Sequence, residues 1–194
     1  MSQGPLVIIS GPSGSGKSTI VARLLATCGL PLRLAVSATT RPPRPSEVDG
    51  VHYYFWSRER FQDEVAAGAF LEWAEVYGHL YGTLRREVDD PRSRGYGVIL
   101  EIDVQGAAQV RQQCPDAVAI FIRTSSLDTY AQRLRQRGTE DPAALQRRLA
   151  AVCHELDQAP RYDYQVVNDD LEQAVAQVCD IIRRHWQRRD THAG

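Results

Sequence analysis

The chain has 194 residues, of which 43% are hydrophobic, and its formal net charge at pH 7 is −1. This length and composition predict one compact domain with a packed core. The balanced charge gives no basic field around the molecule, so we expect neither a nucleic acid nor an anionic membrane as a partner.

The N-terminal segment and the cysteines indicate where the protein works. Met1–Pro5 has no charged side chain, the apolar run Leu6–Ile9 is short, and no segment approaches the length of a membrane span. We therefore expect a cytoplasmic protein. The cysteines are widely separated and form no C-x-x-C pair, which argues against a zinc or redox site and predicts buried reduced thiols; they are Cys28, Cys114, Cys153 and Cys179.

The first predicted elements are a strand at Leu6–Ile9 and a helix at Ser18–Cys28, joined by a glycine-rich loop. The loop fits the phosphate-binding pattern G-x-x-x-x-G-K-[ST] with the octet Gly11-Pro12-Ser13-Gly14-Ser15-Gly16-Lys17-Ser18. The backbone N–H groups of such a loop and the N-terminus of its helix bind the phosphates of a nucleotide. We expect Lys17 to reach the outer phosphates and Ser18 to ligate Mg²⁺.

Lys17 is the single lysine among the 23 basic residues of the chain. A lysine is a compact point charge on a slim stem, whereas an arginine is a wide planar fork. We infer that the phosphate-binding loop requires the lysine, although a single lysine must also fall somewhere by chance. The strand before the loop and the helix after it favour the functional interpretation.

After a second short strand at Leu34–Val36 the pattern changes. The segment from about residue 37 to 90 begins with several prolines, continues with an aromatic cluster at Tyr53–Trp56, and then has helical spacing at Phe61 and Val65. We predict an irregular insert with its own small core, because its edges are too polar for another strand–helix unit of the main sheet.

The alternation of strands and helices then returns. We predict strands at Tyr96–Asp103, Ala117–Ile122 and Tyr164–Val167, and helices at Gly106–Gln113, Leu127–Gln136 and Pro142–Leu156, the last of them capped by Asp141. Asp169 and Glu172 predict a capping box for a final helix with the apolar stripe Leu171, Val175, Val178, Ile182 and Trp186. Together these elements predict an α/β fold with a parallel sheet and helices on both faces.

Six further motifs resemble, at matching separations, those of guanylate kinases, which are P-loop nucleoside monophosphate kinases. They are Ser37–Arg44, Glu47–Tyr53, Phe70–Ala74, Tyr81–Thr83, Glu101–Gly106 and Arg137–Glu140. The resemblance runs from about residue 5 to residue 172. It implies a P-loop NTPase-type sheet in a single domain 1–194, with core segments at about 1–36, 91–126 and 162–194, a GMP-binding insert at about 37–90 and a helical lid at about 127–161.

The resemblance also implies an acceptor site. The phosphate of GMP would be bound by Arg41, Arg44, Tyr53 and Tyr81, the guanine by Ser37, Glu72 and Thr83, and Asp103 would contact GMP or the water shell of Mg²⁺. An ionised Glu72 can accept hydrogen bonds from N1–H and the N2 amino group of guanine, whereas adenine has an acceptor at N1. From residue types alone, the arginines could equally be solvated surface charges and the tyrosines packing residues.

On the donor side, the resemblance implies that Gly11–Ser18 bind ATP and that Asn168 borders the adenine. Lys17 and the lid arginines, Arg133, Arg137 and Arg148, would be catalytic, because cations around the transferred group lower the barrier to phosphoryl transfer.

The chain departs from the family at two positions. Glu101 stands where Asp is usual, and its role stays open. His79 stands where many members have Asn, and we expect an exposed loop side chain without a role.

We therefore predict a cytoplasmic enzyme of purine nucleotide recycling that transfers the γ-phosphoryl group of ATP to GMP with Mg²⁺, giving ADP and GDP. No general base is needed, because the accepting phosphate oxygen is already anionic. Two alternatives are a ribose-bisphosphate-type kinase and a non-catalytic guanylate-kinase-like module that binds peptides. Glu72 argues against the first and the intact octet Gly11–Ser18 against the second. The oligomeric state is not predicted.

Overall fold

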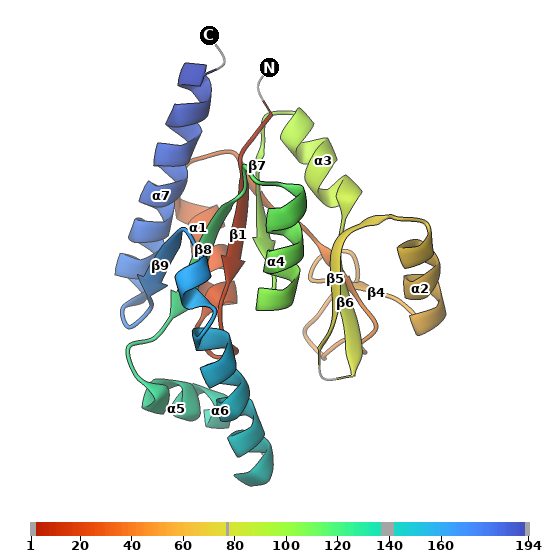
Figure 1. Ribbon diagram of the computed structural model, residues 1–194, viewed down its shortest axis with the longest axis vertical. Coiled ribbons are helices and arrows are strands. Elements are labelled where there is room, and N and C mark those ends of the chain that lie inside the picture. The colour runs from red at the N-terminus through yellow and green to blue at the C-terminus, as the bar shows by residue number, and fades with distance from the viewer. Residues whose placement is uncertain (1–2, 77, 137–141, 193–194) are drawn as a thin grey trace.

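The structure is a computed structural model that describes residues 3–76, 78–136 and 142–192. A five-stranded parallel sheet with the strand order β2-β7-β1-β8-β9 forms its centre (Figure 1). Its strands are β1 (Leu6–Ser10), β2 (Leu32–Leu34), β7 (Gly97–Glu101), β8 (Val118–Arg123) and β9 (Tyr164–Val167). The predicted parallel sheet is therefore confirmed, and β1 lies at its centre, where the strand runs directly into the phosphate-binding loop.

Helices cover both faces of this sheet, as predicted. The helices α1 (Lys17–Thr27) and α7 (Leu171–His192) pack on one face, and α3 (Arg85–Ser93) and α4 (Val104–Gln113) lie on the other. Alternate residues of β1 face the two layers: Val7 contributes to the core with α1 and α7, whereas Ile8 contributes to the core with α3 and α4. Burial on both faces explains the continuous apolar run of β1.

The segment after β2 forms a second, four-stranded sheet with the order β4-β3-β6-β5. Its elements are β3 (Ser37–Thr39), β4 (Tyr54–Phe55), α2 (Arg58–Ala66), β5 (Phe70–Val76) and β6 (His79–Leu84). Phe61 and Phe70 stack in its own small core, as predicted, with ring centroids 4.4 Å apart. The expectation of an irregular insert is wrong, because the segment forms a regular sheet. The sequence did not reveal β3 and β4, because strands of three and two residues are too short to show a periodicity.

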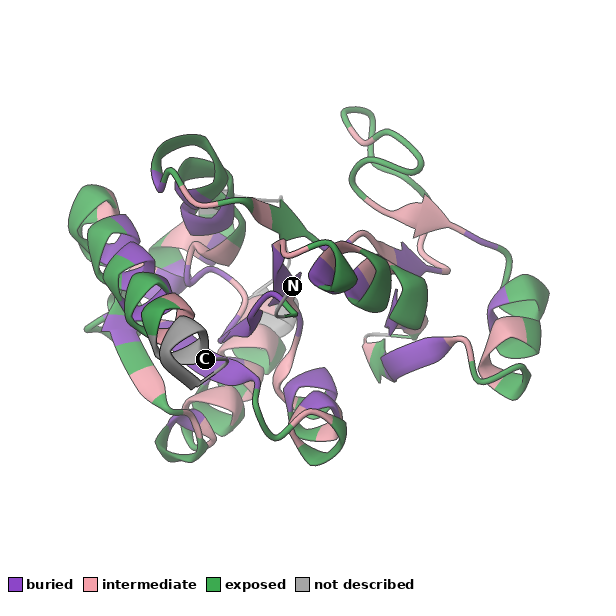
Figure 2. Cartoon of the chain, turned by 90° about the horizontal axis from the view of Figure 1, so that it is seen from above, coloured by how far each residue is buried: buried purple, intermediate pink, exposed green. Residues whose placement is uncertain are grey.

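Two helices, α5 (Leu127–Gln136) and α6 (Pro142–Leu156), extend from one end of the central sheet (Figure 1). They pack through a small cluster that contains Tyr130, Leu134 and Val152. A short 3₁₀ turn at Ala159–Arg161 then leads the chain back to β9. Figure 2 shows buried residues facing inward between the layers and exposed residues on the outer sides of the helices. Asp141, the predicted cap of α6, lies outside the described residues.

The predicted capping box of α7 is wrong by one residue. The carboxylate of Asp169 accepts a hydrogen bond from the backbone N–H of Ser125 at 3.0 Å, whereas Asp170 caps the helix by accepting from the N–H of Gln173 at 2.9 Å. Glu172 pairs with Arg23 of α1 instead. The tertiary contact with Ser125 decides between two adjacent aspartates that the sequence cannot rank.

The prediction of reduced thiols is wrong for two of the four cysteines. Cys28, the C-cap residue of α1, and Cys179, in α7, form a disulfide across a sequence separation of 151 residues. Cys114 and Cys153 are free, but Cys114 is half-buried and Cys153 is exposed, so the prediction of burial is wrong for these two. The pair meets because α1 and α7 pack side by side on one face of the sheet. Within the described ranges, none of the helices combines the length and the apolar character that crossing a bilayer would demand.

Reducing the Cys28–Cys179 bond should lower the melting temperature of the protein. A cross-link over 151 residues constrains the unfolded chain by about 4–5 kcal/mol in the chain-entropy model. At about 2–4 °C per kcal/mol for a domain of this size, the expected fall is on the order of 10 °C.

Circular dichroism melts with and without reductant measure this fall in the melting temperature. A Cys114→Ser/Cys153→Ser variant should keep the difference, a Cys28→Ser variant should lose it, and equal melting temperatures of the oxidised and reduced protein would contradict this prediction.

Candidate functional site: a cleft between two sheets

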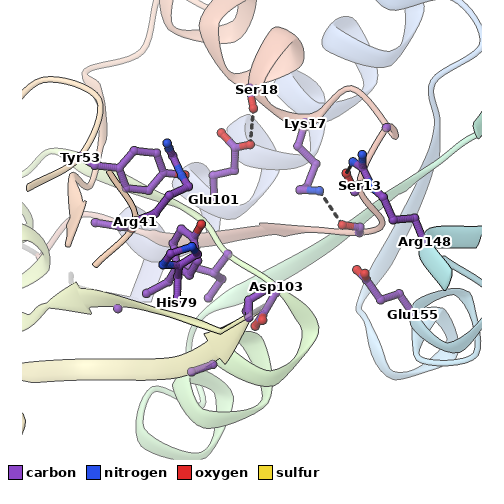
Figure 3. Close-up of a pocket in the computed structure, with 18 of the residues that line it drawn as sticks. Ser13, Lys17, Ser18, Arg41, Tyr53, His79, Glu101, Asp103, Arg148 and Glu155 are labelled. Carbon is purple, nitrogen blue, oxygen red and sulfur yellow. Dashed lines mark hydrogen bonds between the residues drawn. The ribbon is translucent and has the colours of Figure 1, made fainter. Parts of the chain in front are cut away.

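A cleft of about 670 Å³ joins the phosphate-binding loop after β1 to the second sheet. Its volume suits small-molecule ligands of nucleotide size. The predicted residues that line it are Gly11, Ser13, Gly14, Gly16, Lys17, Ser18, Ser37, Arg41, Arg44, Tyr53, Glu72, Tyr81, Asp103 and Arg148. Figure 3 shows that side chains from both sheets and from α6 point into this single cleft.

At one end of the cleft, the loop wraps the N-terminus of α1 as predicted. Gly16 has a φ of 90° at the N-cap position, and the side chain of Asn168 lies against it, so any larger residue would be both strained and blocked. Lys17 Nζ donates hydrogen bonds to the carbonyls of Gly11 at 2.5 Å and Pro12 at 3.1 Å. The ammonium group is therefore held over the loop, where it can meet phosphate oxygens.

Ser18 and Glu101 meet beside the loop. The hydroxyl of Ser18 donates a hydrogen bond to Glu101 Oε1 at 2.5 Å, and both residues line the cleft (Figure 3). Glu101 ends β7, the neighbour of β1, so the parallel register brings its carboxylate to the same edge of the sheet as the loop. The position whose role the sequence left open thus places a carboxylate beside the predicted Mg²⁺ ligand.

Two predicted donor-side residues support the loop from behind and do not line the cleft. Asn168, 4% exposed, donates a hydrogen bond from Nδ2 to the carbonyl of Ser15 at 2.7 Å. Arg133 of α5 donates to the carbonyls of Gly14 at 3.2 Å and of Asn168 at 3.1 Å. In this arrangement both side chains hold the backbone of the loop in shape. Contact of Asn168 with adenine, and of Arg133 with phosphate, stay predictions.

The helix α6 brings charged residues to the same end of the cleft. Arg148 donates a hydrogen bond to the hydroxyl of Ser13 at 3.0 Å, and Arg147 also lines the cleft. Burial raises the pKa of Glu155 to about 7, while the positive charge of Lys17 lowers it. Arg137, the remaining predicted lid arginine, lies outside the described residues.

At the other end of the cleft, Arg41 is held by Glu47, a carboxylate for which the sequence predicted no role. The guanidinium of Arg41 forms an ion pair with Glu47 at 2.8 Å, and Glu47 also accepts a hydrogen bond from the backbone N–H of Arg44 at 2.7 Å. The hydrogen bond from Arg41 is the main reason why the pKa of Glu47 is lowered. A bound phosphate can replace Glu47 as the partner of this guanidinium.

Two tyrosines line the cleft beside Arg41. The rings of Tyr53 and Tyr81 pack edge to face with centroids 6.1 Å apart, and the guanidinium of Arg41 lies 5.6 Å from the centroid of Tyr53. Burial is the main cause that raises the pKa of Tyr53 to about 12, so its hydroxyl keeps its proton at neutral pH. A phenol hydroxyl is a hydrogen-bond donor, so Tyr53 and Tyr81 can both donate to an anion.

Glu72 is a carboxylate buried in the cleft, with 4% of its surface exposed. The hydroxyl of Thr83 donates to its Oε1 at 2.6 Å, and its other oxygen lies against Gly106, where a side chain would clash with it. Burial raises the pKa of Glu72 to about 7, although the hydrogen bond from Thr83 lowers it. Thr83 is itself fully buried and does not line the cleft, so its hydroxyl orients Glu72.

Ser37 and Asp103 complete this end. Ser37 pairs with Thr83 across β3 and β6, which places its side chain near Glu72. Asp103 caps α4 by accepting a hydrogen bond from the N–H of Gly106 at 2.8 Å. One oxygen of this carboxylate is thus used by the helix, which leaves the other for a ligand.

Comparison with known proteins agrees with this geometry. The guanylate kinase family model matches residues 3–185. A guanylate kinase of Neisseria gonorrhoeae is 49% identical over 99% of this chain and 93% of its own length. A guanylate kinase of Symbiobacterium thermophilum is 51% identical over 93% of this chain and 85% of its own length. A crystal structure of guanylate kinase from Anaplasma phagocytophilum superposes with a TM-score of 0.79 at 32% identity, covering 96% of this chain and 88% of that one. The chain belongs to the guanylate kinase family, whose reaction is phosphoryl transfer from ATP to GMP.

Proposed function

We propose that the two ends of the cleft bind the two nucleotides of this reaction, ATP at the phosphate-binding loop and GMP at the second sheet. The observation that carries the proposal is that the buried carboxylate of Glu72 and six residues of the octet Gly11–Ser18 line one cleft. A buried carboxylate suits the paired donors of guanine, and a glycine-rich loop suits phosphates. The single cleft allows the phosphates of the two nucleotides to meet.

The acceptor phosphate is assigned to Arg41, Arg44, Tyr53 and Tyr81. Two guanidinium groups give forked, charge-assisted contacts, and two phenol hydroxyls donate to the remaining oxygens. GMP binding then releases Glu47 from Arg41, so the free enzyme keeps this arginine oriented and neutralised until the substrate arrives. Ser37, Glu72 and Asp103 are assigned to the nucleoside side of the same ligand, where Thr83 orients Glu72.

The donor end is assigned a Mg²⁺ ion with ATP. The oxygens of Ser18 and Glu101, which meet at 2.5 Å, are hard ligands of the kind that Mg²⁺ prefers. When bound, Mg²⁺ would neutralise negative charge on the phosphate oxygens. Lys17 binds and orients the outer phosphates, and Arg148, with Arg147 beside it, supplies positive charge from α6 to the transferred group. Arg133 holds the loop, and Arg137 is assigned to the lid from the resemblance alone.

We place this reaction in the cytoplasm, in purine nucleotide recycling. A ribose-bisphosphate-type kinase would have no use for a buried carboxylate with the Thr83 hydroxyl beside it. A peptide-binding module would have no use for a lysine held over loop carbonyls. Both rival functions are therefore less well supported by the cleft than phosphoryl transfer to GMP.

A coupled assay of ADP release over GMP, AMP, UMP and CMP tests the proposal. We expect a clear preference for GMP, because a base that leaves the buried Glu72 facing a lone pair is rejected by a factor of about ten thousand. Omitting Mg²⁺ should abolish turnover with every acceptor. Equal rates with AMP and GMP, or no rate with any acceptor, would overturn the proposed function.

A further inference from the structure

His79 belongs to the cleft, so the expectation of an exposed loop side chain is wrong. His79 is the first residue of β6, is half-buried, and lines the cleft together with Val76 and Tyr81. Figure 3 shows its imidazole on the side of the cleft that Arg41 and Tyr53 occupy. Among the described residues, none forms a hydrogen bond with the imidazole, so both ring nitrogens can serve a ligand.

The register of the second sheet places His79 at the end of a row of side chains on one face of β6. Successive side chains of a strand alternate between faces, so His79, Tyr81 and Thr83 share one face of β6. Leu80 and Leu84 face the opposite way, into the core of this sheet. The row therefore runs from Thr83, at the guanine side, through Tyr81, at the phosphate side, to His79.

The neighbouring strand β5 confirms this order. Its residues Glu72, Ala74 and Val76 pair with Thr83, Tyr81 and His79 in turn. Glu72, Ala74 and Val76 also line the cleft. A strand rises about 3.3 Å per residue, so His79 lies roughly 7 Å beyond Tyr81 in the direction that leads away from the base.

On the other side of β6, strand β3 leads the chain toward Arg41. Thr39 pairs with Tyr81 across β3 and β6, and the N–H of Thr40 donates to the carbonyl of Leu80 at 3.0 Å. Arg41 follows Thr40 in the chain, just after the end of β3, and lines the cleft together with His79. An imidazole and a guanidinium thus flank the same end of the cleft.

We propose that His79 donates a hydrogen bond to the phosphate of the acceptor nucleotide, as a binding residue in addition to Arg41 and Tyr81. The inference rests on the proposed position of GMP. An imidazole carries at least one N–H donor in either protonation state, and a terminal phosphate offers three strong acceptor oxygens. Ala74 separates Glu72 from Val76 along the wall, so no carboxylate of β5 lies between the imidazole and the phosphate.

Steady-state kinetics of His79→Ala test the proposal. We expect the KM for GMP to rise about tenfold or more, as for the loss of a hydrogen bond to a charged group. The KM for ATP and the inhibition constant of guanosine, which lacks the phosphate, should stay unchanged. His79→Gln, which can place an N–H near the position of the imidazole Nε2, should recover most of the lost affinity. His154→Ala is the matched control, because His154 is exposed on α6 and does not line the cleft.

An unchanged KM for GMP would overturn the role of His79, and so would an equal loss of affinity for guanosine or for ATP. Arg41→Ala in the same assay separates this inference from the proposed function. If Arg41→Ala raises the KM for GMP and His79→Ala does not, only the inference on His79 fails. If neither variant changes it, the acceptor phosphate does not bind at this end of the cleft and the proposed site fails as well.

Discussion

Lys17→Arg is expected to reduce kcat by about a hundredfold, the size of effect that follows the loss of one well-placed charge-stabilising donor, while leaving the fold intact. The ammonium group of Lys17 reaches two loop carbonyls at 2.5 and 3.1 Å, a spacing that suits a compact group. A guanidinium is planar and wider, and its charge is spread over a fork. It would keep the positive charge but could not occupy the same place among the glycines.

The measurement compares kcat and the thermal melts of Lys17→Arg and the unsubstituted enzyme. Arg23→Lys is the control, because Arg23 lies on the same helix, is exposed and pairs with Glu172, so exchanging the two cations there should change neither property. Near-normal turnover of Lys17→Arg would show that the single lysine of the chain stands in the loop by chance. A lower melting temperature with unchanged kcat would assign Lys17 a structural role.

The features that the sequence predicted correctly are those encoded in local patterns. The octet Gly11–Ser18, the strand before it and the helix after it follow one another directly, so their spacing alone identifies the loop. Long apolar strands such as β8 and amphipathic helices such as α6 have periodicities that reveal them. The resemblance then supplied the acceptor residues, of which all except Thr83 line the cleft.

The features that the sequence missed depend on contacts between distant segments. Glu47 is an ordinary surface residue type until the loop folds it onto Arg41, although the spacing of six residues between them was visible. Arg147 was indistinguishable from the other arginines until α6 placed it over the cleft. The disulfide likewise required the packing of α1 against α7, which no spacing between cysteines indicates.

Glu72→Gln should lower kcat/KM for GMP by about a hundredfold or more and leave the KM for ATP unchanged. An ionised carboxylate can accept hydrogen bonds from both donors of guanine, whereas an amide offers one acceptor and one donor group and so faces one of them with a like group. Hydrogen bonds to charged groups contribute about 1.5–3 kcal/mol each, which sets the expected size of the loss. Glu75→Gln, on the same strand but exposed and paired with Arg58, should behave as the unsubstituted enzyme. If the KM for ATP rises as much as that for GMP, Glu72 is structural.

The pH dependence of GMP binding provides a second measure of the same residue. Burial raises the pKa of Glu72 to about 7, so the free enzyme gains a proton at this carboxyl as the pH falls below 7. Because guanine requires the ionised form, the KM for GMP should rise toward acid pH, by up to about tenfold per pH unit well below the pKa.

The phosphate of GMP also titrates, with a pKa of about 6, and adds its own pH dependence to the KM. Glu72→Gln separates the two, since it retains the phosphate titration and loses the carboxyl one. A KM profile from pH 8 to pH 5.5 that is the same for both enzymes would mean that guanine is not bound by an ionised Glu72.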